Sequence, residues 1–484
     1  MKKTERSVMH IKQYTAALLV STLLAGCMVG PHYHEPAANA PDKWLSATSP
    51  ENAQAVSEQN WWEHFGDPVL SQLISKALAG NLDLKIEEAR IAEARATRAS
   101  ARADLLPTVN TDANAERQGN RLAFGNAPFD LSKPFNTFQA GFDASWELDL
   151  FGGKRHEIEA DAAELKAAEA TRDDVRISLL AEVARTYMDI REYQAQLAII
   201  DKTLAADQQT LDIANQRFKA GTSPGLEVTQ ASAQMDQAKS DIPHTQSLLT
   251  QAEYSMDVLL GEKPGSAHAL LAEAKPIPVP DKNLVLAAPA QVIANRPDIK
   301  VAERKLAAAT AQQGIATAAF FPDISLSGFL GLLNTDAGNL LRTDSKSWDI
   351  GGNLLWPILN FSKLSAGLDA ANARQQEAFL TYRKSVIAAL ADVERSLTAY
   401  TKQQEEKELL DKTAEENRHA VDIAQMRYKE GLSSFIEVLD AERTLYASES
   451  KSSNTDAAAA QNLIAVYKSL GGGWKNKDTG PAIK

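Results

Sequence analysis

The sequence has one cysteine among 484 residues, which excludes an intramolecular disulfide. A chain of this size must therefore be held together by its core or by oligomerisation. Common catalytic motifs are also missing, since there is no Gly-x-Ser-x-Gly, no His-Glu-x-x-His, no cysteine pair and no phosphate loop. The eight histidines are scattered, and His32 and His34 alone are weak evidence for a metal site. These absences favour a protein that is not an enzyme and that uses no metal or other cofactor.

An excess of basic residues is missing as well. The chain has 51 Lys and Arg against 63 Asp and Glu, a net charge of −12. Residues 1–26 carry four basic residues and Glu5, a charge of +3, so the chain that follows them carries −12 − 3 = −15. Nucleic acid requires basic faces, and this balance argues against it as a partner.

The apolar run Tyr14 to Ala25, which follows four basic residues, is too short to span a bilayer. Its layout is that of a secretory signal over residues 1–26. The run ends in Leu24-Ala25-Gly26-Cys27, a pattern that resembles the bacterial lipobox, which implies that Cys27 is lipidated. Met28, rather than Asp, follows, and by resemblance to sorted lipoproteins this favours the outer membrane. The alternative is an incidental cysteine near a signal cleavage site.

A long internal duplication organises the rest of the chain. At an offset of 210, nine residues around Gly221 recur around Gly431. Pro107 recurs as Pro322 at an offset of 215, so a loop between Pro107 and Trp146 should be five residues shorter in the second half. One structural unit is therefore used twice. The nine recurring pairs are Asp212/Asp422, Ile213/Ile423, Ala214/Ala424, Arg217/Arg427, Lys219/Lys429, Gly221/Gly431, Ser223/Ser433, Glu227/Glu437 and Val228/Val438.

Each copy of the repeat predicts the tip of a helical hairpin. Apolar residues at helical spacing lead to a basic last turn, then to a glycine where a helix end requires positive φ, and then to a new helix start. The sequence predicts long helices over 154–219 and 363–429, about 100 Å each at 1.5 Å per residue, and return helices over 226–260 and 434–470. An earlier helix is predicted from Val69 to about Asp104, with Asp67 as its N-cap and Pro68 at its first position.

Between the helices, four stretches alternate with a period of two, which predicts β-strands. They are Phe138–Leu148, Ile324–Leu330, Trp348–Trp356 and the weaker Thr108–Ala115. A soluble antiparallel sheet would alternate in the same way. Aromatic residues near the strand ends of an exported chain favour a membrane barrel. Four strands are too few to close a barrel, because about eight are needed even for a filled one, so several chains would have to share it.

These patterns divide the chain into six segments. The predicted segments are 1–26 as signal peptide, 27–60 as a lipidated extended tether, 61–260 as the first repeat, 261–290 as a Pro-rich linker, 291–474 as the second repeat and 475–484 as a tail.

The combined motifs resemble the TolC-type outer-membrane efflux proteins, and most of all the lipoprotein branch that serves resistance-nodulation-division pumps. The likeness covers nearly the whole mature chain and rests on the lipobox, Trp61-Trp62…Phe65…Asp67-Pro68, Trp146-Glu-Leu-Asp-Leu-Phe-Gly152, Asn295-Arg-Pro-Asp298, the paired tips and Leu470-Gly-Gly-Gly-Trp474. The resemblance implies a homotrimer that is mainly α-helical, with a hollow helical barrel through the periplasm. Each protomer would add four strands to one shared transmembrane β-barrel in the outer membrane. Implied partners are a periplasmic adaptor (membrane fusion) protein, an inner-membrane pump and outer-membrane lipid.

The resemblance also assigns roles to residues. The tips would dock the adaptor through Arg217, Gly221, Thr222, Ser223, Arg427, Gly431, Leu432 and Ser433. The stretch after the second tip would line a periplasmic gate formed by Ile436, Glu437, Asp440 and Arg443. Residues 221–225 read Gly-Thr-Ser-Pro-Gly where the second tip has Gly-Leu-Ser-Ser, so the two tips need not dock equivalently. The alternative to a gate in the stretch after the second tip is a solvated helix face with an exposed ion pair.

Two other functions fit parts of this pattern. A periplasmic structural or adaptor lipoprotein built on a coiled-coil hairpin would explain the tips, the charge and the lipid, but would not need four alternating strands at equivalent positions of a duplication. A channel for protein secretion is the alternative within the channel class. The compound that is exported cannot be read from a water-filled duct.

Overall fold

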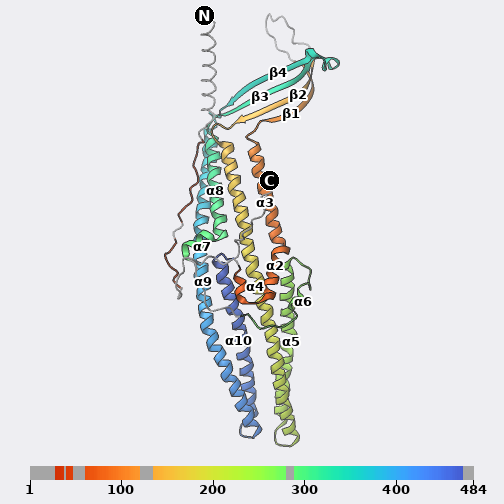
Figure 1. Ribbon diagram of the computed structural model, residues 1–484, viewed down its shortest axis with the longest axis vertical. Coiled ribbons are helices and arrows are strands. Elements are labelled where there is room, and N and C mark those ends of the chain that lie inside the picture. Colours follow the sequence, from red (N-terminus) through yellow and green to blue (C-terminus); the bar gives the residue numbers. More distant parts are fainter. Residues whose placement is uncertain (1–27, 38–39, 47–59, 120–133, 279–287, 473–484) are drawn as a thin grey trace. The chain divides into compact units, whose positions relative to one another are not determined.

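The computed structural model describes residues 28–37, 40–46, 60–119, 134–278 and 288–472 (Figure 1). The signal segment, Cys27 and the tail at 475–484 lie outside the described residues. The chain forms two compact units, and each takes segments from both halves of the sequence. Unit 1 comprises Met1–Pro36, Arg90–Ala168 and Val301–Tyr382, and unit 2 comprises Ala37–Ala89, Glu169–Lys300 and Arg383–Lys484.

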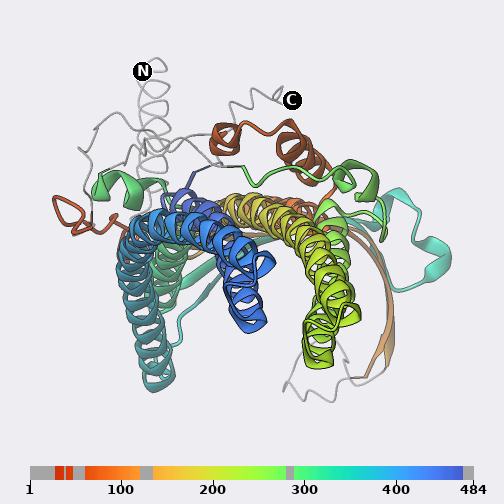
Figure 2. The same ribbon diagram turned by 90° about the horizontal axis from the view of Figure 1, so that it is seen from below.

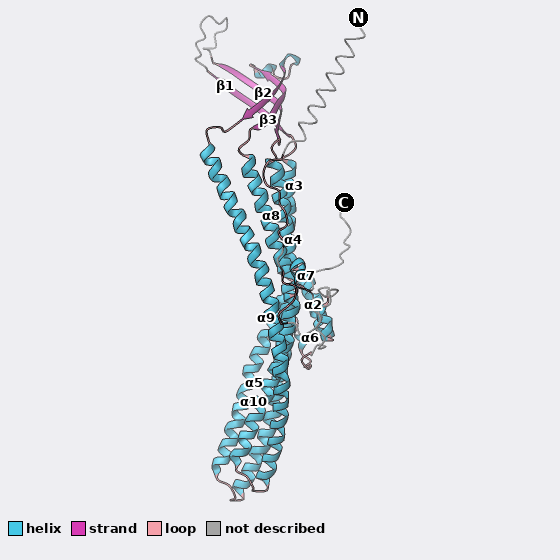
Figure 3. Ribbon diagram, turned by 90° about the vertical axis from the view of Figure 1, so that its left-hand side faces the viewer, coloured by secondary structure: helices cyan, strands magenta, loops and turns pink. Residues whose placement is uncertain are grey.

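Unit 1 holds a four-stranded antiparallel sheet in the order β1-β2-β3-β4, drawn in magenta in Figure 3. All four predicted strands are present, although Trp356 lies just beyond the last one. The strands are β1 (Thr108–Gln118), β2 (Phe135–Leu148), β3 (Asp323–Asn334) and β4 (Lys346–Leu355). Between β1 and β2 lie 16 residues (119–134) and between β3 and β4 lie 11 (335–345), so the second connection is shorter by 16 − 11 = 5, as the offsets predict. It contains two short helices, η2 (Ala337–Asn339) and η3 (Thr343–Ser345).

The register of the sheet places apolar side chains on one face. Phe142 lies opposite Leu330, which lies opposite Trp348, and all three are more than half exposed. In the neighbouring cross-strand row, Phe329 pairs with Asp143 on one side and with Asp349 on the other, and these three side chains point to the opposite face. Because strand residues alternate between faces, one face of the sheet offers a continuous apolar band.

The duplication is visible as a repeated hydrogen bond. The indole Nε1 of Trp146 donates to the carbonyl of Leu105 at 2.9 Å, and that of Trp356 donates to the carbonyl of Phe320 at 3.1 Å. Each bond joins the strand-side tryptophan to the residues that precede the other strand of its pair. The same sequence element therefore performs the same structural role in both halves.

Long helices account for most of the remaining chain, as the cyan ribbons of Figure 3 show. The predicted helices are confirmed as α4 (Gly153–Lys219), α5 (Gly225–Leu260), α9 (Phe361–Lys429) and α10 (Phe435–Ser469), with α8 (Pro297–Ala318) preceding β3. Within the described residues, none of the helices combines the length and apolar character that a membrane span needs.

The helix predicted from Val69 to Asp104 is wrong in one respect, because Asn81 divides it. The two pieces are α2 (Pro68–Gly80) and α3 (Leu82–Ala103). The Asn81 side chain accepts from the Leu84 backbone N–H at 3.1 Å and donates to the Leu259 carbonyl at 2.9 Å, so it caps α3 and ties it to α5. The predicted start is confirmed, since Asp67 accepts from the Val69 backbone N–H at 2.8 Å and Pro68 is the first helical residue.

Aromatic and aliphatic residues make the core of unit 2. Trp61 and Phe65 of the short helix η1 (Trp61–Phe65) are buried. The Trp61 ring stacks on the Tyr467 ring of α10, with 5.3 Å between the ring centroids. The Pro-rich linker is not free of structure, because it contains α6 (His268–Leu271) and the first residues of α7 (Pro289–Asn295), and Leu271 is fully buried.

The described parts of the predicted tether contain no helix or strand, and they contact the protein body. In unit 1, the backbone N–H of Val29 donates to the Phe151 carbonyl at 3.1 Å, and the Tyr33 hydroxyl donates to Glu303. In unit 2, Trp44 is buried in the core and the backbone N–H of Leu45 donates to Glu394 at 2.7 Å. The buried Trp44 ring and these hydrogen bonds hold the described parts in place.

Candidate functional site

Two helical hairpins of unit 2 end in the tips that the sequence predicts (Figures 1 and 2). Gly221 follows α4 with φ 73° and Gly431 follows α9 with φ 76°. The next residues close the turns, since the backbone N–H of Thr222 donates to Arg217 O at 2.9 Å and that of Leu432 to Arg427 O at 2.8 Å. A Cβ at either glycine would meet nothing within 4 Å, so the backbone conformation, not the packing, requires glycine there.

The side chains of the predicted docking residues differ in what they offer to a partner. Leu432, Thr222 and Arg427 are exposed. The hydroxyls of Ser223 and Ser433 are buried, and within the described chain they have no hydrogen-bond partner. Of the pair Leu432 and Ser433, only the leucine therefore presents its functional group at the surface.

The fold brings the two hairpins together at a residue that the sequence analysis missed, Tyr428 of α9. Its hydroxyl donates to Glu227 of α5 at 2.7 Å, and its ring lies 4.4 Å from the guanidinium carbon of Arg217 on α4. Arg217 also donates to the Tyr428 carbonyl at 2.7 Å. Burial and the hydrogen bond to Glu227 raise the pKa of Tyr428, which keeps the hydroxyl protonated as a donor. Arg217 thus holds the hairpins together, rather than standing free for a partner.

A comparison of the two repeats could have found this residue. Phe218 stands at the position equivalent to Tyr428, and it is 51 % exposed whereas Tyr428 is 3 % exposed. A hydroxyl gained at one copy of a duplicated position indicates a contact that the other copy does not make. Tyr428 packs with Phe435 and Val438 of α10, so the second tip is buried around it.

The four predicted gate residues lie on the first turns of α10, but they do not act alike. Ile436 is exposed, and Glu437 accepts from the Ser434 hydroxyl at 3.0 Å and forms a capping box, so it stabilises the helix start. Asp440 accepts from Arg443 at 2.9 Å, three residues along the same helix. Both side chains are mostly exposed, as expected if the two residues form an ion pair on a solvated helix face.

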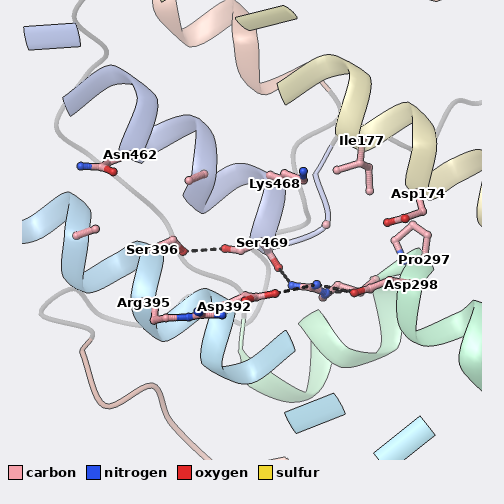
Figure 4. A pocket seen from close by; sticks show the side chains of 14 residues that line it. Asp174, Ile177, Pro297, Asp298, Asp392, Arg395, Ser396, Asn462, Lys468 and Ser469 are labelled. Atoms are coloured by element: carbon pink, nitrogen blue, oxygen red, sulfur yellow. Dashed lines mark hydrogen bonds and ion pairs between the residues drawn. The ribbon is translucent and has the colours of Figure 1, made fainter. Parts of the chain in front are cut away.

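A second polar cluster lies at the motif Asn295-Arg-Pro-Asp298, beside a cavity of about 480 Å³ (Figure 4). Arg296 donates to the Asp298 carboxylate at 2.6 Å and 3.0 Å and to the Ser469 carbonyl at 2.8 Å, and it pairs with Asp392 at 3.6 Å. Burial lowers the pKa of Arg296, but these acidic partners outweigh that effect and raise it. The guanidinium ties the start of α8 to α9 and to the end of α10, which is a structural role.

No group of three or more His, Cys, Asp or Glu side chains that could hold a metal ion occurs in the part of the chain that the structure describes. The return helix predicted over 434–470 is confirmed as α10, and Gly471 and Gly472 follow its end. Gly471 has φ 75°, and the Gly472 backbone N–H donates to the Tyr467 carbonyl at 3.0 Å. Gly471 and Gly472 therefore cap a helix and do not form a phosphate loop.

Comparison with known proteins finds one family over almost the whole chain. Residues 73–262 and 288–472 match the family described as outer membrane efflux protein. The pyoverdine export outer membrane protein OpmQ of Pseudomonas aeruginosa is 32% identical over 468 residues, which cover 96% of this chain and 97% of OpmQ. The solvent efflux pump outer membrane protein SrpC of Pseudomonas putida is 33% identical over 93% of this chain and 96% of its own. The solved structure of the outer-membrane channel OprN superposes with a TM-score of 0.87 at 32% identity, over 93% of this chain and 100% of OprN.

Proposed function

The chain belongs to the outer membrane efflux protein family and is the outer-membrane channel component of an efflux system, and we propose that it acts as a passive exit duct for small molecules. The observation that carries this proposal is the family match over both halves of a duplicated chain, each half ending in a capped hairpin tip. The proposed duct is a homotrimer, in which three chains contribute strands to one barrel.

The sheet supports a β-barrel that several protomers share. Its apolar face is exposed in a single chain, although Trp348 and Leu330 would normally be buried or in contact with lipid. Four strands cannot close a barrel, and three chains of four strands can. Lipidation at Cys27 would place an acyl anchor next to Met28, which packs against Gly152 four residues after the end of β2.

The tips are proposed to dock a periplasmic adaptor, with a pump of the resistance-nodulation-division type beyond it. Exposed apolar side chains at both tips support this docking. Leu226, Leu432 and Ile436 are each more than 60 % exposed, and Leu226 and Ile436 occupy equivalent positions of the repeat. Exposed leucines and isoleucines grouped at a helix end are typical of a contact surface.

The gate proposal keeps Ile436, Glu437, Asp440 and Arg443 near the mouth of the trimer, with different roles. Glu437 caps the helix, and the exposed Asp440–Arg443 pair is available to neighbouring copies. Tyr428 and its two partners join this set, because they hold one hairpin of the protomer against the other.

Planar-bilayer recordings and export assays test the function together. We expect the purified trimer to conduct ions, and we expect cells that lack the chain to accumulate a small exported compound that the wild-type gene clears. A protein that forms no trimer and no channel would contradict the channel function. Retention of a secreted protein, with normal clearance of small molecules, would favour protein secretion instead.

A further inference from the structure

The helices α4, α5, α9 and α10 each contribute a side chain to one buried polar layer. This layer lies farther from the tips, along the helices, than the Tyr428 contact. Glu442 of α10 accepts from Thr210 of α4 at 2.7 Å and from Gln425 of α9 at 2.8 Å. The Gln234 amide of α5 donates to Asp207 of α4 at 2.8 Å and lies 3.4 Å from the second oxygen of Glu442. The layer therefore joins the hairpin α4–α5 to the hairpin α9–α10.

Two carboxyl groups share this layer, and no Lys, Arg or His among the described residues pairs with either of them. Asp207 is 2 % exposed and Glu442 is 6 % exposed. The helices around them contribute Thr210, Gln234 and Gln425, which are neutral, and the charged group that acts on Glu442 is Asp207 itself. Oδ2 of Asp207 is buried and, among the described residues, has no hydrogen-bond partner.

Two adjacent buried anions are unfavourable because burial removes their hydration and each repels the other. Burial raises the pKa of both Asp207 and Glu442, and the charge of Asp207 raises that of Glu442 further. A single proton on the pair removes the repulsion, and the Gln234 amide then bridges a carboxylic acid and a carboxylate. The layer is stable when it holds that proton.

We propose that Asp207 and Glu442 form a proton-binding latch that fastens the two hairpins of a protomer to each other. The latch is tight when the pair carries one proton and loosens when that proton leaves and both groups are charged. Acid conditions would therefore hold the tips together, and rising pH would let the hairpins separate. The ligand is a proton, and the latch is independent of the exposed pair Asp440–Arg443, which salt can screen.

Infrared spectroscopy tests the proton directly and does not depend on the chain being a channel. In a pH titration, the purified full-length protein should show the stretch band of a protonated buried carboxyl from this pair, and the band should disappear as pH rises. Glu192 has a raised pKa and gives a band of its own, so the comparison is made in a Glu192→Gln background. There, Glu442→Gln or Asp207→Asn should remove the band, and Asp422→Asn at an exposed acid should leave it unchanged. Absence of the band from Glu192→Gln alone at every pH, or an intact band in both latch variants, would overturn the proposal.

Conductance tests the consequence and rests on the proposed channel. In about 1 M salt, where the screening length is about 3 Å, the surface ion pair contributes little. The ratio of open to closed tips in wild type should rise with pH, by at most about tenfold per pH unit for one coupled proton. Glu442→Gln should hold that ratio low at every pH, and Asp422→Asn, at an exposed acid outside the gate, should keep the wild-type slope.

Trimer yield and melting temperature of Asp207→Asn control for folding, because this variant keeps the shape of the side chain and its bond to Gln234. Wild-type pH dependence in both latch variants would end the proposal. A response of wild type to Ca²⁺ that a chelator reverses, with no carboxyl band, would replace the proton by a cation. A chain that forms no channel but loses its band in Glu442→Gln would refute the function and leave the latch standing.

Discussion

The hydroxyl of Tyr428 donates to the carboxylate of Glu227 at 2.7 Å, a bond between the end of α9 in one hairpin and the start of α5 in the other. Phe218, at the duplicated position, cannot make this bond and is exposed. The two halves of the chain therefore share a fold, but only the second half supplies the tyrosine that fastens them. Changes at this bond should alter the opening of the tips without altering the fold.

Tyr428→Phe should open the channel. The variant keeps the ring against Arg217 but loses a hydrogen bond to a carboxylate, which is worth about 1.5–3 kcal/mol. The ratio of open to closed tips should rise about ten- to a hundredfold, as single-channel recordings would show. Phe218→Tyr adds a hydroxyl at an exposed position and serves as the matched control, with wild-type conductance expected. Equal conductance of Tyr428→Phe and wild type would remove Tyr428 from the gate.

Gly431→Pro should abolish adaptor-dependent efflux while trimers remain in the membrane. Proline fixes φ near −65° and removes the backbone N–H that donates to the Tyr428 carbonyl, whereas the turn needs φ 76°. Gly431→Asn is the control, because asparagine tolerates the left-handed region, and it should retain most efflux. Accumulation of an exported dye measures both variants. Normal efflux with proline would count against a docking role for this tip.

Asp440→Ala combined with Arg443→Ala tests the gate. Within one chain the exposed pair contributes only about 0.3–0.5 kcal/mol, so the melting temperature should change little. If copies of these residues meet across the threefold axis, the double variant should conduct more than wild type at low salt, and high salt should narrow the difference. Equal conductance at low salt would leave the pair as a solvated helix face.

Cys27 should be the acylated first residue of the mature chain. Intact-mass analysis should give an acylated chain that begins at residue 27, and an unmodified mature protein would contradict this prediction. Efflux should persist in Cys27→Ser, because the apolar band of a trimeric barrel already holds it in the membrane.

Glu192 should make stability depend on pH. Burial, followed by the charge of Asp189, raises the pKa of Glu192 from 4.5 to about 7. The native state then binds a proton that the unfolded chain releases, so its contribution to stability is largest below about pH 4.5 and is lost as pH rises to about 7. Melting temperatures of wild type should therefore fall relative to Glu192→Gln across this window. Glu182→Gln, at an exposed acid, should follow wild type, and parallel curves for all three proteins would refute the assignment.

Much of this architecture is encoded locally and could be predicted. Helical spacing, the basic last turns and the glycines at 221 and 431 define the hairpins, because a helix end with φ above zero depends on neighbouring residues alone. The constant offsets predicted which loop is shorter, and the period of two predicted the strands. The Asp67 cap was equally readable, since a cap contacts residues two or three positions away.

Other features depend on residues that are far apart in sequence, and only the tertiary structure decided them. Asn81 divides a helix because it also reaches the Leu259 carbonyl, and Arg217 serves the hairpin contact because α9 brings Tyr428 beneath it. The described tether residues around Trp44 lie against unit 2 because Trp44 is buried in its core. The pairing of Asp207 with Glu442 joins residues of different repeats through Gln234. A one-dimensional pattern records which side chains can bury or pair, and packing alone determines which partners they meet.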